Sequence, residues 1–263
     1  MAIERLAGRD VTRVRADNPS PLTLDGSNSW VAGRDPCWVI DPGPGLPAHL
    51  QALCAEVERR GGLGGIALTH RHADHAEAVP GLRQLAGRVP VAAATGDADV
   101  PLADGERFGP LTAVSVPGHS PDHLAFVTGP VCFTGDAVLG RGSVFISPEP
   151  GAMSGYLSAL RRLRAMELEL LCPGHGPPVP DANAKLDEYL EHRLDRERHL
   201  VAALERGLRT EDDLLDAAWS DAPPALRPAA ALTLRAHLHK LREEGRLPAG
   251  VQVRAHSDAH PAA

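Results

Sequence analysis

The stretch Ile66-Ala67-Leu68-Thr69-His70-Arg71-His72-Ala73-Asp74-His75 decides how this sequence is interpreted. A short apolar run with the character of a buried strand ends in four side chains that can ligate a metal, and a helical pattern follows. Residues two apart at the tip of an extended strand lie on the same side, so His70 and His72 can bind one ion. Asp74 and His75 fall where the chain turns into the helix and can face a second ion. Three imidazoles and a carboxylate suit zinc and other borderline divalent ions.

Three other predicted strands also end in a possible ligand. These are His119 in Pro117-Gly118-His119, Asp136 in Thr134-Gly135-Asp136, and His175 in Pro173-Gly174-His175-Gly176. The alternative is that they are ordinary turn residues, because Pro-Gly and Gly-Asp pairs are common in turns. Four separate elements that all deliver ligand types favour a shared metal site over that alternative.

The first part of the chain alternates between strand and helix patterns, which predicts an α/β (α+β) fold with helices packed outside mixed sheets. Apolar runs that end in Gly, Pro, Asp or His predict strands at Cys37–Ile40, Ile66–Thr69, Ala113–Val116, Val131–Thr134 and Leu168–Cys172. Amphipathic periodicity predicts helices at Pro47–Arg60, Ala76–Ala86 and Ser154–Met166.

The pattern changes after Pro177-Pro178-Val179-Pro180, where we expect a small helical domain to follow. Periodicity predicts one long charged helix at Lys185–Arg206 and shorter helices at Thr210–Trp219 and Pro228–Glu244. Gly245–Leu247 and Val251–Val253 could form a small hairpin or wing. The predicted organisation is a catalytic domain at 1–180, a winged-helix-like domain at 181–256 and a frayed tail at 257–263.

Composition limits the kinds of partner. The chain has 263 residues, of which 43% are hydrophobic, and a formal net charge of -7, so neither duplex DNA nor a membrane is an expected partner. Segment 1–18 lacks the apolar core of a secretory signal, and no run is long enough to span a bilayer. The four cysteines are scattered and include no CxxC pair, which is typical of small core residues in a reducing compartment. We therefore expect a cytoplasmic protein.

With these motifs the sequence resembles the metallo-beta-lactamase superfamily, over nearly its whole length. The resemblance implies a four-layer αββα sandwich with metal ligands on loops at one edge. The implied ligands are His70, His72 and His119 for the first metal and Asp74, His75 and His175 for the second, with Asp136 bridging the two. Zinc is the favoured metal, and manganese or iron are the alternatives.

Two further residues take their interpretation from the same motifs. Asp41, in Ile40-Asp41-Pro42-Gly43, matches the early aspartate of the superfamily and would support a ligand from outside the coordination sphere. Its alternative is a turn aspartate before proline. His123 is expected to be a hydrogen-bonded structural residue, because the ligand set is complete without it. His49, His192, His199, His237 and His239 are expected to be surface or packing residues.

Such a site predicts a dinuclear hydrolase. Two divalent ions lower the pKa of a bridging water and polarise the oxygen of the bond under attack, so a bridging hydroxide is the expected nucleophile. Asp74 is the candidate catalytic residue, placed to orient that hydroxide and later take up its proton. The ligands predict hydrolysis without naming the bond, because this chemistry serves lactams, thioesters, lactones and phosphodiesters alike.

The segments 117–140 and 172–193 and the helical tail resemble the beta-lactamase-like protein 2 group in particular. That resemblance implies an endoribonuclease acting on single-stranded RNA, and the group's similarity to thioesterases leaves a small ester or acyl thioester as the alternative substrate. A third alternative is a DNA-binding regulator whose metal domain senses a ligand. Acidic residues balance the arginines of the tail, which favours a solvated face with paired charges over a nucleic-acid surface. The tail could instead cover the active-site edge or mediate a homodimer.

Overall fold

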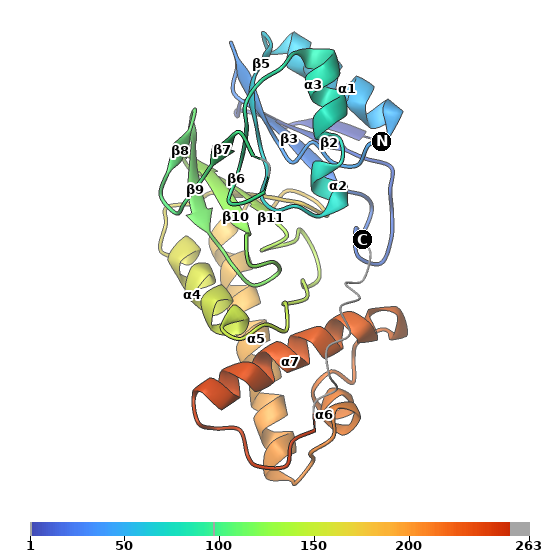
Figure 1. Cartoon of the computed structure of the whole chain (residues 1–263), viewed down its shortest axis with the longest axis vertical. Helices are drawn as coiled ribbons and strands as arrows, with labels where there is room; N and C mark the ends of the chain where they lie inside the picture. Colours follow the sequence, from blue (N-terminus) through green and yellow to red (C-terminus); the bar gives the residue numbers. More distant parts are fainter. Residues whose placement is uncertain (1, 97, 253–263) are drawn as a thin grey trace.

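Two β-sheets packed face to face form the centre of the structure, a computed structural model that describes residues 2–96 and 98–252 (Figure 1). The first sheet contains, in spatial order, β1 (Ala2–Arg5), β2 (Val11–Arg15), β3 (Asn28–Ala32), β4 (Cys37–Ile40), β5 (Leu63–Ala67), β6 (Val91–Ala93) and β7 (Val100–Pro101). The second contains β12 (Leu170–Pro173), β11 (Val131–Gly135), β10 (Leu124–Thr128), β9 (Leu111–Ser115) and β8 (Arg107–Phe108).

Strand direction places the loops that carry the predicted ligands at one edge of each sheet. In the first sheet β4, β5, β6 and β7 run parallel, and in the second β11 and β12 run parallel, while the remaining neighbours are antiparallel. Parallel neighbours end at the same edge of a sheet, so β4 and β5 deliver Asp41 and His70 side by side. By the same rule β11 and β12 deliver Asp136 and His175 together.

Helices cover the outer face of each sheet. Between the sheets the core contains Trp30, Phe126 and Phe133. On the outer face of the first sheet, α1 (Pro47–Arg59) and α3 (Val79–Ala86) pack through residues such as Leu53 and Leu82. On that of the second, α4 (Ala152–Arg164) and α5 (Ala182–Glu205) pack their own apolar side chains. The layer order is therefore the expected αββα.

The expected helix at Ala76–Ala86 is divided in two. A short helix, α2 (Ala73–Ala76), precedes α3, and the Ala78 amide between them donates to the Gly43 carbonyl at 2.9 Å. Pro80 stands in the first turn of α3, where its missing N–H costs no hydrogen bond. The break lets α2 stay at the sheet edge, carrying Asp74 and His75, while α3 covers the sheet.

A small second core lies in the C-terminal part. It is formed by the end of α5 with α6 (Glu211–Ala218) and α7 (Arg227–Glu243), which follows the 3-10 helix η1 (Pro224–Leu226), and it contains residues such as Leu204, Leu214 and Leu241. The Thr210 hydroxyl caps α6 by accepting the Asp213 amide at 3.2 Å. Within the described residues 245–252 no hairpin forms; the Gln252 amide instead donates to the Arg209 carbonyl at 2.8 Å. Val253 and the predicted frayed tail lie outside the described residues.

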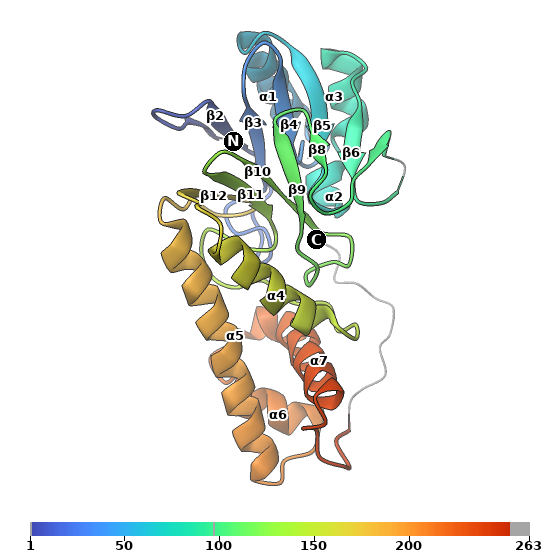
Figure 2. The same ribbon diagram turned by 90° about the vertical axis from the view of Figure 1, so that its left-hand side faces the viewer.

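Helix α5 joins the two parts, as Figure 2 shows. Its beginning contributes Leu186 and Tyr189 to the core of the part that contains both sheets, which the sequence predicts to be catalytic and which is named here the catalytic part. Its end contributes Leu200 and Leu204 to the C-terminal core. The helix therefore runs without interruption across the region beyond residue 180, where the sequence predicts the second domain to begin. Among the described helices, none has the length and apolar character that a bilayer span requires.

A buried carboxylate ties α1 to the first two strands. Glu56 Oε1 accepts hydrogen bonds from Thr12 Oγ1 at 2.7 Å and Arg60 Nε at 2.9 Å, and Glu56 Oε2 accepts from Arg5 Nη2 at 2.9 Å. Arg59 adds a bidentate contact on the same carboxylate. Burial alone would raise the pKa of Glu56, but the donors from Arg59, Thr12 and Arg60 outweigh it and hold the pKa well below its usual value of 4.5.

Replacing Glu56 by Gln is expected to lower the free energy of unfolding by about 3 kcal/mol, because Arg60 then remains buried without a counter-charge. Urea denaturation at pH 7 measures this loss. Because the pKa is depressed in the folded state, the difference between the proteins should shrink as pH falls below 4.5.

Glu58→Gln, at an exposed position of the same helix, is the matched control and should change stability by no more than about 0.5 kcal/mol. Equal stabilities for Glu56→Gln and Glu58→Gln at pH 7 would contradict the structural role of this cluster.

Candidate metal centre

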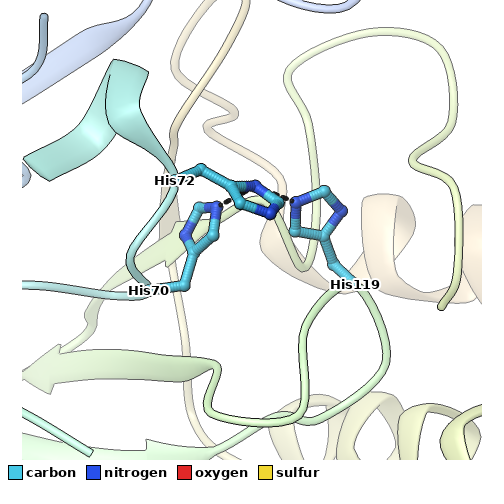
Figure 3. A group of neighbouring side chains, drawn as sticks. All are labelled: His70, His72 and His119. Atoms are coloured by element: carbon cyan, nitrogen blue, oxygen red, sulfur yellow. Dashed lines mark hydrogen bonds between the residues drawn. The ribbon is translucent and has the colours of Figure 1, made fainter. Parts of the chain in front are cut away.

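Three histidines form the first group at the edge where the two sheets meet. His72 Nδ1 lies 3.0 Å from His70 Nε2 and 3.0 Å from His119 Nε2 (Figure 3). His70 and His72 come from the loop between β5 and α2, and His119 from the loop after β9. Three imidazoles from two loops thus present one ring nitrogen each to a common point.

The second group combines one carboxylate with two imidazoles. His175 Nε2 lies 3.2 Å from Asp74 Oδ2, and His75 Nε2 lies 3.4 Å from the same oxygen. Asp74 and His75 are in α2, whereas His175 follows β12. All three side chains are buried.

Asp136, directly after β11, lies between the two groups. Its Oδ1 is 3.4 Å from His75 Nε2, and its Oδ2 is 3.3 Å from His175 Nε2 and 3.6 Å from His119 Nε2. The structure therefore brings together all seven residues that the sequence singles out, in the groupings that the resemblance implies.

Gly174 leaves the space that this arrangement needs. A Cβ atom at Gly174 would lie 2.4 Å from Asp136 Oδ1 and 2.6 Å from His75 Cε1, closer than real contacts allow. A Cβ atom at Gly135, where φ is +47, would lie 2.4 Å from Thr69 Oγ1. The glycines that precede Asp136 and His175 in the motifs are thus required by close packing around the ligands.

Asp41 orients His75 from behind. Its backbone is left-handed, with φ 50, and its carboxylate accepts the Thr69 amide at 2.7 Å and the Thr69 hydroxyl at 2.7 Å. Asp41 Oδ2 also lies 2.9 Å from His75 Nδ1. Because an ionised carboxylate only accepts, Nδ1 of His75 is the donor and Nε2 is turned towards the ligand groups.

The other ring nitrogens of two more ligands are held in a similar way. The Thr69 hydroxyl, which donates to Asp41, accepts from His70 Nδ1 at 3.0 Å. His119 Nδ1 lies 3.4 Å from the Phe145 carbonyl, and the two rings are 4.5 Å apart. Both contacts leave Nε2 of the histidine facing the shared site.

His123 has a different place from the ligands. Its Nε2 accepts the Asp136 amide at 3.1 Å, so this nitrogen fixes the backbone of Asp136. Burial lowers the pKa of His123 well below its usual value, which keeps the ring neutral and able to accept. This agrees with the structural role expected from the sequence.

The site holds opposing charges in a buried environment. Burial opposes protonation of His75 and His175, but neighbouring carboxylates outweigh it and raise both pKa values, that of His175 to about 9. Burial would raise the pKa of Asp74, yet the charge of His75 and a hydrogen bond from His175 lower it to about 2. For His119, burial dominates and lowers the pKa to about 4.

The residues present fit divalent metal ions. His75 Nε2 and Asp136 Oδ1 are buried atoms without a hydrogen-bond partner, and they face each other across the site. A buried polar atom without a partner is costly, whereas a cation between these atoms would satisfy both. Imidazole nitrogens and carboxylate oxygens are also the donors that zinc and related ions prefer.

Several contacts at the site have no marker in the sequence. Ser27 Oγ donates to Asp74 Oδ2 at 3.0 Å, although Ser27 is distant in sequence and belongs to no recognisable motif.

The sequence predicts His49 to be a surface or packing residue without partners. In the structure His49 is buried and contacts Ser29 Oγ at 2.9 Å and the Pro42 carbonyl at 3.1 Å. His237 packs in the C-terminal core beside Trp219. His199 is exposed, and His192 and His239 are half-buried.

A cavity of about 340 Å³ adjoins the ligands. His72, Asp74, His119, Asp136 and His175 line one side of it. Most of the remaining wall is apolar, from Leu22, Leu24, Leu139, Val144, Phe145, Trp219, Ala222, Pro223, Leu226, Ala229 and Ala230. Its basic residues are Arg141, His192, Arg193 and Arg196. A concave, largely apolar pocket with a few polar groups at one side is typical of a small-molecule site.

Comparison with known proteins gives this arrangement a family. Residues 22–101 and 99–175 match the Metallo-beta-lactamase superfamily, and residues 210–256 match the Beta-lactamase associated winged helix domain. The chain is 28% identical to the Beta-lactamase-like protein 2 homolog of Caenorhabditis elegans, over 92% of this chain and 87% of that protein. It is 31% identical to the atrochrysone carboxyl ACP thioesterase of Paecilomyces divaricatus, over 78% of this chain and 67% of that protein.

A solved structure supports the fold. The crystal structure of a beta-lactamase domain protein from Burkholderia ambifaria aligns with a TM-score of 0.77 and 21% identity, over 92% of this chain and 88% of that one. Two sheets, their helical layers and the winged-helix appendage thus accompany a buried cluster of histidines and aspartates. The chain belongs to the metallo-beta-lactamase superfamily, as a metal-dependent hydrolase with a C-terminal winged-helix domain.

Proposed function

We propose that this chain is a dinuclear hydrolase of acyl thioesters. The observation that carries the proposal is the apolar cavity beside the candidate metal centre. An acyl thioester presents an uncharged carbonyl for attack and an apolar group that such a cavity can bury. The relative named as an ACP thioesterase supports the same substrate class.

We assign the metal ligands as the sequence predicts. His70, His72 and His119 would hold one divalent ion, Asp74, His75 and His175 the second, and Asp136 would contact both. Zinc suits this imidazole-rich set, and manganese or iron are the alternatives. When bound, the two ions would acidify a water and polarise the carbonyl oxygen of the substrate.

The protein's own groups prepare this step. Asp74 is held by the Ser27 hydroxyl, which donates to Oδ2 at 3.0 Å, and by His175, whose Nε2 lies 3.2 Å from the same oxygen. An ionised carboxylate at this position can orient the attacking water through a hydrogen bond and take up its proton. Asp41 and Thr69 keep Nε2 of His75 and of His70 directed into the site, and the apolar cavity wall excludes bulk water from the acyl group.

Single-stranded RNA fits this cavity less well. Its phosphates need free cationic side chains, but two of the three arginines in the wall are already engaged. Arg193 donates to the Val144 carbonyl, and Arg196 pairs with Asp221 at 2.7 Å and lies over the Trp219 ring. A phosphate would therefore have to compete with these internal partners.

A DNA-binding regulator is also disfavoured by contacts of the C-terminal domain. One face of α7 is turned to the cavity and the catalytic part, where the Ile146 amide donates to Thr233 Oγ1 at 3.1 Å. Four arginines of the domain, Arg198, Arg227, Arg235 and Arg246, are paired with carboxylates, whereas the exposed Arg206 and Arg242 have no carboxylate partner among the described residues. We keep the cytoplasmic location as part of the proposal, since Cys37, Cys132 and Cys172 serve as buried core residues.

Asp136→Asn is expected to lower hydrolysis at least about 100-fold and to reduce the bound metal, because the buried carboxylate contacts both ligand groups. The zinc-loaded full chain is given acyl thioesters, single-stranded RNA and a chromogenic beta-lactam, with metal content measured by elemental analysis. Asp187→Asn, at an exposed site, is the matched control. Cleavage of RNA alone would overturn the thioester proposal, and full activity in a metal-free preparation would refute the metal mechanism.

Asp41→Asn is expected to weaken zinc affinity by about 10- to 100-fold, because the neutral amide no longer holds the Nδ1 proton of His75 as a carboxylate does. Asparagine keeps the shape and tolerates the left-handed backbone, and it removes both the negative charge and one of the two oxygens that accept hydrogen bonds from Thr69 and His75. Competition with a chelator measures the affinity. An affinity equal to that of Asp187→Asn would rule out the assigned role of Asp41.

A further inference from the structure

The cavity has walls from both parts of the chain. The catalytic part supplies the candidate ligands and the loop that contains Phe145. The C-terminal domain supplies Leu226, Ala229, Ala230 and Thr233, which are spaced i, i+3, i+4 and i+7. Leu226 ends η1 at the N-cap of α7, and Ala229, Ala230 and Thr233 follow at the spacing of one helix face, so these four residues form a single stripe at the start of α7, named here the α7 stripe.

Helix α7 is fixed in this position. Thr233 Oγ1 accepts the Ile146 amide at 3.1 Å and donates to the Ala229 carbonyl at 3.2 Å. Further along, Glu243 Oε1 accepts the Gly151 amide at 2.8 Å, and Ala236 packs into the core of the catalytic part. In Figure 1 α7 accordingly lies across α5, on the side of the catalytic part. The stripe is therefore a built wall of the cavity and not a loosely placed surface.

The stripe combines small side chains with a larger one. Ala229 and Ala230 have the smallest side chains of the four cavity residues, and none of the four is charged. The candidate ligands that would act on the scissile carbonyl line the same cavity. An acyl chain bound in this cavity with its carbonyl at those ligands would have the two alanines among the side chains available to contact its apolar portion.

We infer that the α7 stripe determines which acyl groups the enzyme accepts, with Ala230 and Leu226 as specificity-determining residues of the winged-helix domain. This inference rests on the proposed thioesterase function for its substrate class. The domain would then serve as part of the acyl-binding site, with a helix face that selects the ligand by size. A larger residue at Ala230 would exclude long acyl chains, and a smaller one at Leu226 would admit bulkier groups.

The first test uses Ala230→Phe in the zinc-loaded full chain. We expect the ratio of kcat/KM for decanoyl to acetyl thioester to fall by about tenfold or more, because contacts with several methylenes are lost. Leu226→Ala should raise the ratio of kcat/KM for branched or aromatic acyl thioesters to that for acetyl thioester. Ala225→Phe is the matched control, since Ala225 is exposed in η1 and does not line the cavity.

The second test needs no catalysis. The uncharged fluorescent probe N-phenyl-1-naphthylamine is bound to each variant and displaced by a series from butanol to decanol. Decanol should compete about tenfold less well in Ala230→Phe than in the natural chain or in Ala225→Phe. Circular dichroism and metal content show that each variant is folded and loaded.

The outcomes separate the two proposals. Altered decanol competition without hydrolysis of any thioester would support the acyl-size wall and reject the thioesterase function. The inference that the α7 stripe selects acyl groups by size would be overturned if folded Ala230→Phe left both decanol competition and the decanoyl-to-acetyl ratio unchanged and folded Leu226→Ala left the preference for branched or aromatic acyl groups unchanged. Failure of the natural chain to bind the probe or decanol would overturn the same inference.

Discussion

The buried carboxylate of Asp41 is the contact on which the candidate metal centre depends. It joins the loop after β4 to the loop after β5 through Thr69, and it reaches α2 through His75. Because Thr69 in turn contacts His70, one carboxylate influences a histidine in each ligand group. The parallel pairing of β4 and β5 makes this possible, since it brings both loops to the same edge of the sheet.

The protein contains two buried charged clusters, one with a structural role and one that forms the candidate metal centre. Around Glu56, arginine and threonine donors satisfy the carboxylate, and the cluster connects α1 to the first sheet. Around Asp136, a carboxylate oxygen and an imidazole nitrogen remain without hydrogen-bond partners although both are buried. The first cluster is complete without a ligand, whereas a cation bound at the second would supply its missing interactions.

The C-terminal domain belongs physically to the active-site region. Helix α5 enters both hydrophobic cores, and α7 is bonded to the loop that carries Phe145, whose ring and carbonyl contact His119. The start of α7 lines the cavity beside the candidate ligands. This arrangement gives the winged-helix domain a place in the wall of the cavity that adjoins the candidate metal centre.

The sequence by itself determined the ligand types, the order of strands that carry them and the helical nature of the tail. These features are local: a histidine two residues from another at a strand end, a Gly-Asp turn and an amphipathic stripe each specify their geometry over a few residues. Only the tertiary structure decided that Ser27 contacts Asp74, that His49 is buried and bonded, and that the helix near Ala76 divides. It also decided that Leu226, Ala229 and Ala230 line the same cavity as the candidate ligands. Those outcomes depend on packing between segments far apart in the chain, where ordinary serine, alanine and leucine residues acquire their roles from what lies opposite them.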